Sequence, residues 1–166
     1  MADATGYKVL QYNSSTKKYT SVKTVTGAST VTATVTGLKS GTDYKFEVQP
    51  YVTENGKTAT AKASAAYSTV TKPAKVKITK TASTKNSVTL KWKKVTASGY
   101  KVQQYNAKTK KWTNVKSVAA SKTSVKITKL KKNTSYKFRI VAYKKLGSKS
   151  YSGAASATKT VKTKKK

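Results

Sequence analysis

The stretch LKKNTSYKFRIVAY, Leu130–Tyr143, decides the fold of the second half of the chain. It joins a leucine, a short polar turn and a long segment in which apolar and polar residues alternate. One face of that segment carries Tyr136, Phe138, Ile140 and Ala142. The other carries Lys137, Arg139, Val141 and Tyr143. A period of two residues indicates a half-buried β-strand.

The same pattern occurs earlier in the chain, as LKSGTDYKFEVQPY, Leu38–Tyr51. The match extends upstream, where ATGYKVLQYNSSTKKYTSVKTV, from Ala4, aligns with ASGYKVQQYNAKTKKWTNVKSV, from Ala97. A deletion of one residue separates the two matching blocks. Each copy is long enough to have its own core, so the pattern indicates a tandem duplication rather than a solenoid.

Composition and pattern give opposite indications. Leu, Ile, Val and Phe total 27 of 166 residues, and the net charge is +32, a combination typical of disordered chains. However, 28 threonines, 11 tyrosines and two tryptophans lie in alternating register between turn signals. These residue types suit a pleated, half-buried surface. We therefore expect a folded β protein with a thin core.

The second copy predicts seven short strands and shows no helical periodicity. They are expected near residues 75–80, 87–93, 100–106, 112–117, 124–128, 136–143 and 150–158. Strands of this number and spacing favour an antiparallel sandwich. In the first two strands, alternation directs these apolar residues inward: Val76, Ile78, Val88, Leu90 and Trp92.

Residues 73–160 resemble a fibronectin type III domain. The resemblance rests on Trp92 in the second strand, on GYKVQQY in the third, and on a tyrosine corner. In such a corner the tyrosine hydroxyl bonds to nearby backbone. The corner residues are Leu130 and Tyr136 in the second copy and Leu38 and Tyr44 in the first. The usual proline of the corner is replaced by Asn133 and by Gly41.

This resemblance implies an all-β chain of two tandem immunoglobulin-like antiparallel β-sandwiches. We expect repeat 1 over residues 1–71, a complete repeat 2 over 72–160, and a basic tail over 161–166. In the second copy 24 residues, Pro73 to Thr96, precede Ala97, whereas three precede the matching Ala4. Repeat 1 is therefore expected to lack its two N-terminal strands, and Met1 to mark a cut through a repeat array.

The absence of five inward apolar side chains would remove about 7 to 15 kcal/mol from repeat 1, at about 1.5 to 3 kcal/mol for each. This is comparable to the whole stability of a small domain, about 5 to 15 kcal/mol. We expect residues 1–72 alone not to unfold cooperatively. A strand near residues 31–36 would then lack its sheet neighbour, and its open edge would invite a donated strand or aggregation.

Residue types argue against catalysis. The chain has no cysteine and no histidine, which excludes disulfides, thiolate metal sites and a histidine base. Its only acids are Asp3, Asp43, Glu47 and Glu54. The outward Glu47 and the loop-borne Glu54 are not expected to converge on one bond. Serine and lysine are too abundant for a Ser–Lys dyad to be informative. We expect no enzyme, no cofactor and no metal site.

Charge is the strongest physical signal. Residues 1–72 carry nine lysines and four acids, a net +5, whereas residues 73–166 carry 27 basic residues and no acid, a net +27. Arg139 is the single arginine. Lysine reads bases poorly, so sequence-specific nucleic-acid binding is disfavoured, while nonspecific polyanion binding stays open.

In a sandwich of the fibronectin type, three of the strand connections share a pole with the C-terminus. The lysines expected to converge there are Lys85, Lys108, Lys110, Lys111, Lys129, Lys131, Lys132, Lys162, Lys164, Lys165 and Lys166. The alternative interpretation, which we favour, is that these are solvated turns whose charge maintains solubility and protects strand edges.

A set of aromatic residues is expected on an outer sheet face, and its role has two interpretations. The set contains Tyr12, Tyr19, Tyr51, Tyr105, Trp112 and Tyr143. Together they would line an outer sheet face, either to stack on sugars or bases, or to pack across strands in a sheet with few aliphatics. We favour packing.

The resemblance implies a non-catalytic spacer and adhesion module of a larger secreted or cell-surface bacterial protein, partnered by the other domains of that protein. The alternative is a polyanion-binding module for teichoic acid, anionic polysaccharide or nucleic acid. No apolar run reaches transmembrane length and no signal peptide is present, so membrane insertion is not expected. Either the chain stays inside the cell or it is a fragment; we favour the fragment, with an extracellular or cell-surface location by resemblance.

Overall fold

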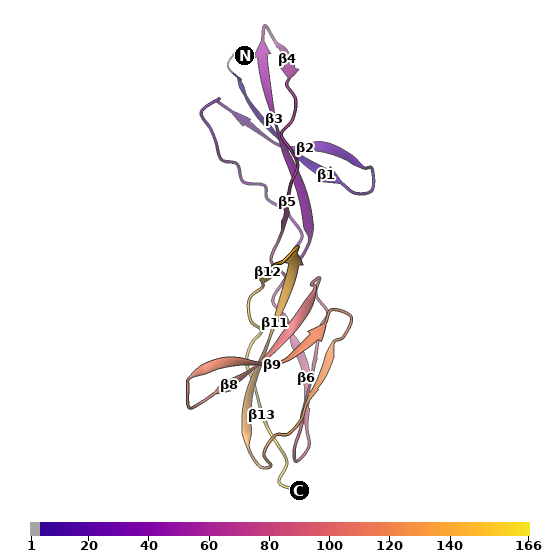
Figure 1. The fold of residues 1–166 in the computed structure, drawn as a ribbon, viewed down its shortest axis with the longest axis vertical. Helices are drawn as coiled ribbons and strands as arrows, with labels where there is room; N and C mark the ends of the chain where they lie inside the picture. Colours follow the sequence, from indigo (N-terminus) through magenta and orange to yellow (C-terminus); the bar gives the residue numbers. More distant parts are fainter. Residues whose placement is uncertain (1–3) are drawn as a thin grey trace. The chain divides into compact units, whose positions relative to one another are not determined.

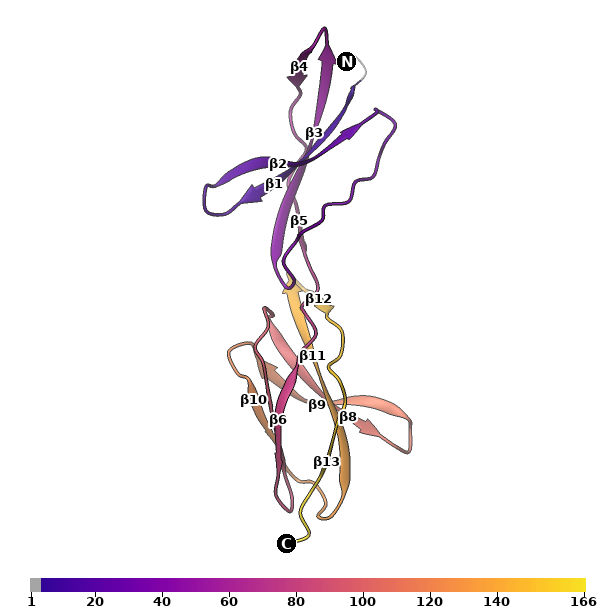
Figure 2. The same ribbon diagram turned by 180° about the vertical axis from the view of Figure 1, so that it is seen from behind.

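The computed structural model describes residues 4–166, and its regular elements are thirteen β-strands that pair antiparallel. The prediction of an all-β antiparallel fold is confirmed. The chain divides into two compact units (Figures 1 and 2). The first unit contains the described residues up to Lys39 together with Asp43–Thr69, and the second contains Ser40–Thr42 together with Val70–Lys166.

The second unit consists of two antiparallel sheets. The three-stranded sheet has the order β10-β7-β6, and its strands are β6 (Ile78–Ser83), β7 (Val88–Trp92) and β10 (Ser124–Ile127). The five-stranded sheet has the order β12-β11-β8-β9, with β13 also paired to β11. Its strands are β8 (Gly99–Asn106), β9 (Lys111–Ala119), β11 (Ser135–Leu146), β12 (Lys149–Ser152) and β13 (Lys159–Lys162).

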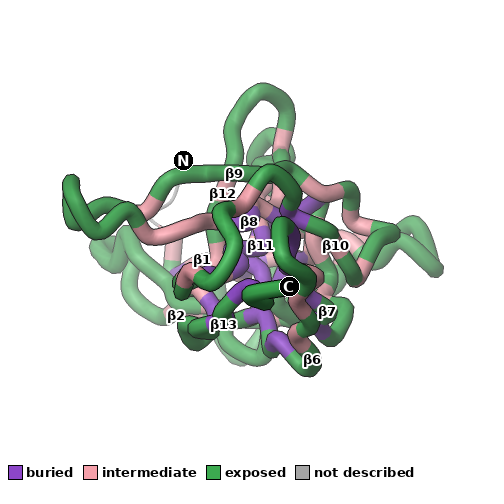
Figure 3. The backbone as a smooth tube through the Cα atoms, turned by 90° about the horizontal axis from the view of Figure 1, so that it is seen from below, coloured by how far each residue is buried: buried purple, intermediate pink, exposed green. Residues whose placement is uncertain are grey.

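The core of the second unit lies between these two sheets. Figure 3 colours buried residues purple, and they gather around β6, β7, β8, β11 and β13. The five inward positions predicted for the first two strands are confirmed, since Val88 and Leu90 are fully buried and Val76, Ile78 and Trp92 are nearly so. The Trp92 ring meets the Tyr100 ring edge-on at 5.2 Å between centroids.

The end of the second unit differs from expectation. The predicted last strand, 150–158, is replaced by β12, an irregular stretch and β13. In the irregular stretch the Ile140 amide donates to the hydroxyl of the buried Ser156 at 2.9 Å. The predicted basic tail begins too early, because Val161 belongs to β13 and to the core, and Thr163 is buried. Val161 and Thr163 alternate with the exposed Lys162 and Lys164, so one face of this segment is buried and the other faces solvent.

The first unit contains one sheet with the order β2-β1-β3-β4, and β5 also pairs with β3. Its strands are β1 (Gly6–Asn13), β2 (Lys18–Thr26), β3 (Asp43–Glu54), β4 (Lys57–Thr60) and β5 (Tyr67–Val70). By the internal alignment they correspond to β8, β9, β11, β12 and β13. Within the described residues this unit has no counterpart of β6 or β7.

The strand predicted near residues 31–36 does not form. This segment aligns with β10, whose sheet neighbour is β7, paired from Ser124↔Lys91 to Ile127↔Val88. The first unit offers that segment no such neighbour among residues 4–72. A strand needs a paired partner to satisfy its backbone groups, so the alternating sequence alone does not produce one here.

Candidate functional site

Three loop segments of the second unit meet at one end. They are the β6–β7 turn, the β10–β11 turn and the C-terminal residues after β13. Backbone hydrogen bonds join them: the Lys164 amide donates to the Thr84 carbonyl at 3.0 Å, and the Leu130 amide donates to the Asn86 carbonyl at 3.0 Å. The amide of Asn133 donates to the Lys164 carbonyl at 3.1 Å. These bonds hold the three segments in fixed relation, although each is irregular.

A cleft of about 600 Å³ lies between these segments, and we call it the basic cleft. It is lined by Lys85, Asn86, Leu130, Lys132, Lys165 and Lys166. All four lysines are exposed, and residues 73–166 contain no acid that could neutralise them. Converging cations raise the local positive potential and attract anions.

The remaining lysines of the predicted pole divide into two groups. Lys129, Lys131 and Lys164 lie on the same loops as the basic cleft, and Lys162 ends β13 beside them; all four are exposed but do not line the cleft. Lys108, Lys110 and Lys111 lie elsewhere, at the tip of the β8–β9 hairpin, which projects to the side of the unit (Figures 1 and 2).

The expected convergence of all eleven lysines is therefore wrong for the hairpin tip. The pairing of β8 with β9 shifts register between Val102 and Gln103. Such a bulge bends and twists a hairpin, which re-aims the tip.

Sequence reasoning missed Thr163 as a support of this end. Its buried hydroxyl donates a hydrogen bond to the Lys131 carbonyl at 2.7 Å and accepts one from the Thr134 amide at 3.0 Å. It thereby ties the C-terminal segment to the β10–β11 turn. The alternation of Val161 and Thr163 with lysines was the available signal.

Both units contain a tyrosine corner with the same geometry. The Lys131 amide donates to the Tyr136 hydroxyl at 2.8 Å, and the Lys39 amide donates to the Tyr44 hydroxyl at 2.8 Å. Leu130 and Tyr136 pack against the core of the second unit. The two positions that replace the usual proline, Asn133 and Gly41, have φ of +51° and +67°. Proline cannot adopt positive φ, whereas asparagine and glycine tolerate it.

The aromatic residues form cross-strand pairs on the outer sheet faces. Tyr12 pairs with Tyr19 at 5.2 Å between ring centroids, and Tyr105 pairs with Trp112 at 5.3 Å. The outer rings are covered by cations from other strands of the same sheet: Lys45 over Tyr12, Lys137 over Tyr105, Arg139 over Trp112, Lys8 over Tyr51 and Lys101 over Tyr143. This geometry favours packing over ligand stacking, because the covering cations occupy ring faces that a ligand would need.

The described acids do not form a catalytic arrangement. Asp43, Glu47 and Glu54 all lie on β3, at least four residues apart. At about 3.3 Å per residue this separates neighbouring pairs by about 13 Å or more, beyond the range for paired carboxylates. The pKa of Tyr19 lies above its ordinary value, mainly because partial burial disfavours the charged phenolate and also because the Glu47 carboxylate is nearby. Within residues 4–166, no three metal-ligating side chains come together.

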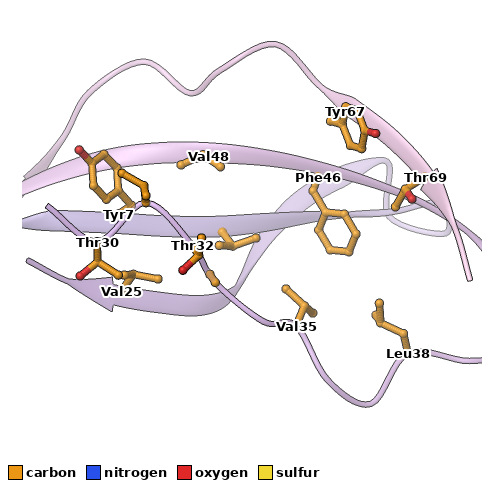
Figure 4. A pocket seen from close by; sticks show the side chains of 13 residues that line it. Tyr7, Val25, Thr30, Thr32, Val35, Leu38, Phe46, Val48, Tyr67 and Thr69 are labelled. Atoms are coloured by element: carbon orange, nitrogen blue, oxygen red, sulfur yellow. The ribbon is translucent and has the colours of Figure 1, made fainter. Parts of the chain in front are cut away.

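The first unit contains an open apolar cleft of about 620 Å³ (Figure 4). Its floor is formed by the inward face of the sheet and one wall by the segment 30–38. Several of its apolar side chains are strongly exposed: Val31 by 90%, Tyr67 by 72% and Val48 by 43%. Below, it is called the apolar cleft.

In the part of the chain that the structure describes, no helix is long and apolar enough to cross a membrane. The sequence matches no curated protein.

The fold is similar to that of a solved two-domain fibronectin type III segment from chicken tenascin. The two chains are 20% identical, and the match has a TM-score of 0.60, covering 98% of this chain and 87% of that one. A three-domain segment of chicken CNTN1, FN1–FN3, matches with 20% identity and a TM-score of 0.49, covering 96% of this chain and 54% of that one. The model of the fibronectin type III domain family matches residues 71–158, more than half of the sequence. The chain therefore belongs to the fibronectin type III family.

Proposed function

We propose that this chain is a non-catalytic spacer and adhesion segment of a larger secreted or surface protein of bacterial type. The observation that carries the proposal is the second unit, which combines a closed core with an outer face whose aromatic rings are occupied by its own cations. Such a unit is a rigid, solvated body. The separation of the acids along β3 supports a role without acid–base chemistry.

The test is to replace residues 73–160 in the parent protein by a neutral fibronectin type III unit of equal length. A spacer role predicts that cell attachment by the parent protein is retained, because only length and rigidity matter. Loss of attachment with the neutral unit contradicts the spacer role and assigns the adhesion to the surface of residues 73–160 itself.

We further propose that the first unit is a fibronectin type III repeat without its first two strands. Its five strands correspond to β8, β9, β11, β12 and β13, and its tyrosine corner has the same hydrogen bond. Circular dichroism and calorimetry on residues 1–72, with and without about 25 residues of preceding parent sequence, test this. Cooperative unfolding of the short form as a monomer contradicts it.

A second candidate function is polyanion binding, and the basic cleft favours it. Three segments fixed by backbone hydrogen bonds bring Lys85, Lys132, Lys165 and Lys166 around one cleft. Point charges held together release more counterions on binding one polymer than the same charges spread over the surface. Teichoic acid, anionic polysaccharide and nucleic acid share the required negative charge.

Elution from a heparin column separates the two candidates. Three variants of the full chain each change lysines to glutamine. The first changes the cleft residues Lys85, Lys132, Lys165 and Lys166. The second changes the strand residues Lys75, Lys77, Lys91 and Lys93. The third changes the hairpin-tip residues Lys108, Lys110 and Lys111. A cleft site predicts the largest fall in eluting salt for the first variant.

Equal falls for the first two variants contradict a cleft site and support diffuse charge that only keeps the chain soluble. A largest fall for the third variant moves the site to the hairpin tip. On duplex DNA, the logarithm of the binding constant should fall with the logarithm of salt by about 0.9 per phosphate neutralised.

A further inference from the structure

The single arginine of the chain, Arg139, lies on the outer face of the larger sheet of the second unit. Its guanidinium carbon is 4.3 Å from the centre of the Trp112 ring, a distance at which cation and ring attract each other. Its Nε donates to the side-chain oxygen of Gln103 at 2.7 Å. Arg139 belongs to β11, Gln103 to β8 and Trp112 to β9, which are neighbours in the sheet. Contacts with two other strands therefore hold the guanidinium in place before any ligand binds.

Gln103 is itself held by a further side chain. Its side-chain nitrogen donates to the side-chain oxygen of Asn114 at 2.9 Å, and the two residues pair directly across β8 and β9. Arg139 pairs directly with Gln103 across β11 and β8. Asn114, Gln103 and Arg139 thus form a hydrogen-bonded row across three strands, which we call the amide–arginine row. Both amide oxygens of this row already accept a hydrogen bond.

The groups that remain open in the amide–arginine row are donors. Among residues 4–166, the two Nη groups of Arg139 and the side-chain nitrogen of Asn114 have no hydrogen-bonding partner. Arg139 is half-buried and Asn114 is exposed, so water reaches both. Residues 73–166 contain no acid that could pair with the guanidinium. A fixed cation with two open, parallel donors is complementary to a group with two acceptor oxygens.

The equivalent place in the first unit has a different chemistry. By the internal alignment, Leu10, Ser21 and Glu47 occupy the three positions of the row, and Tyr19 replaces the tryptophan. The carboxylate of Glu47 lies near Tyr19 and contributes to its raised pKa. The sign of the charge is therefore reversed, and the neighbouring amide is replaced by an aliphatic side chain. The donor arrangement belongs to the second unit and is not a general property of the shared sheet.

We propose that Arg139 is the centre of an oxyanion-binding site that takes a carboxylate, sulfate or phosphate group through its two Nη atoms. Two oxygens of such a group match the two parallel N–H donors, and Trp112 and Gln103 fix the orientation of the fork. Lys137 lies two residues along the same face of β11, about 7 Å away, and adds positive potential. None of these residues lines the basic cleft, so the site is separate from that cleft and does not rest on its function.

Nuclear magnetic resonance of the full chain tests the site. Because the chain has one arginine, the Nε–H group of Arg139 gives a single signal that needs no assignment. The chain is titrated with sodium phosphate, sodium sulfate or sodium acetate, with sodium chloride added to hold the ionic strength constant. The proposal predicts a shift of this signal that saturates.

The three anions distinguish the sources of the oxyanion. Tightest binding of acetate identifies a carboxylate site, whereas tightest binding of sulfate or phosphate identifies a site for those groups. A shift that is equally large when chloride alone is varied contradicts the proposal, because screening would then explain it.

A substitution that conserves charge separates the fork from the charge. Arg139→Lys cannot form two parallel hydrogen bonds and should weaken binding by about tenfold, the loss of one hydrogen bond to a charged group. The Trp112 indole and Asn114 amide signals report binding in this variant. Lys91→Arg, on β7 of the other sheet, is the matched control and should leave binding unchanged. Equal affinities of Arg139→Lys and the unchanged chain overturn the proposal.

Two further variants remove charge. Arg139→Gln should abolish saturable binding, whereas Lys137→Gln should weaken it by about twofold, as expected for an exposed charge. Equal losses from the two variants overturn the proposal in favour of diffuse charge. The indole signal of the buried Trp92 verifies in each variant that the core is intact.

The cleft variant described above, with four lysines changed to glutamine, separates this site from the basic cleft. It should retain the Arg139 titration, whatever its elution from heparin. Loss of the titration in that variant places the bound anion in the basic cleft and overturns the proposal.

Discussion

Phe46 and Phe138 occupy the same place in two copies of one sequence pattern, on strands with the same neighbours. Phe138 is fully buried, whereas Phe46 lies beside an open cleft. The units also share a register shift, between Val9 and Leu10 in one and between Val102 and Gln103 in the other. What differs is the covering sheet. Among the described residues, the sheet of the first unit has the strand order and the corner of the larger sheet of the second unit, while side chains on its inward face line the open apolar cleft.

The segment 31–36 and β10 make the same point for secondary structure. Both alternate apolar and polar residues and both lead to a corner leucine, Leu38 or Leu130. Only β10 has a strand beside it, and only β10 is a strand. Strand formation here depends on pairing more than on local preference.

The largest difference in stability between the units is expected from truncating their equivalent phenylalanines. Phe138→Ala should lower the free energy of unfolding of the second unit by about 3 to 5 kcal/mol, because a large buried side chain leaves a cavity. Phe46→Ala should cost the first unit much less, because its ring is only half-buried. Urea unfolding followed by tryptophan fluorescence measures the first effect, and amide exchange of β1 and β3 the second. Equal losses of stability in the two units would contradict the difference in burial between Phe46 and Phe138.

A smaller difference in stability is expected at a serine hydroxyl that occupies equivalent positions in the two units. In the second unit the Ile140 amide donates to Ser156 at 2.9 Å, and in the first the Val48 amide donates to Ser64 at 3.0 Å. Ser156→Ala should cost about 1 to 3 kcal/mol, because it leaves a buried amide without a partner. Ser64→Ala should cost less, since water reaches the exposed site. The same two unfolding measurements apply, and a larger loss from Ser64→Ala would reverse the expected order.

Substitutions in the two tyrosine corners should have similar effects. Each hydroxyl accepts one backbone amide at 2.8 Å. Tyr136→Phe and Tyr44→Phe should therefore each cost about 0.5 to 1.5 kcal/mol, the usual net contribution of one hydrogen bond. An effect confined to the second unit would mean that the corner acts only when a closed core lies behind it.

Salt should produce the smallest difference. The second unit contains most of the net charge, +27 for residues 73–166 against +5 for residues 1–72. Raising sodium chloride shortens the screening length, which is about 10 Å at 0.1 M, and weakens repulsion between lysines on neighbouring strands. The melting midpoint of the second unit should rise from low to moderate salt. A flat or falling midpoint contradicts this.

The sequence was sufficient to predict the fold class, the duplication and the inward residues of the first two strands, because these depend on alternation within one segment. The path after β12 was less predictable. Residues 153–158 follow β11 through single hydrogen bonds, such as that of Ser156, which leave no periodic trace. The lysines on either side of Val161 and Thr163 predict a solvated tail, although both side chains are buried.

The candidate site was predictable only in part. The loops that form the basic cleft follow from strand order, so Lys85, Lys132, Lys165 and Lys166 could be grouped from the sequence. The sideways direction of the β8–β9 tip could not, since it accompanies a bulge at Val102–Gln103 that no residue type announces. The support by Thr163 depends on the tertiary contact with the Lys131 carbonyl.

The two units share the strand order of one sheet, but only the second has a closed core, and amide hydrogen exchange of the full chain tests this contrast. Amides of β8 and β11 should exchange only on global unfolding of the second unit. Amides of β1 and β3 should exchange far faster, and those of residues 31–36 at the rate of unprotected backbone. Equal protection of β3 and β11, or protection of residues 31–36 in the isolated monomer, would show that the first unit also has a closed core.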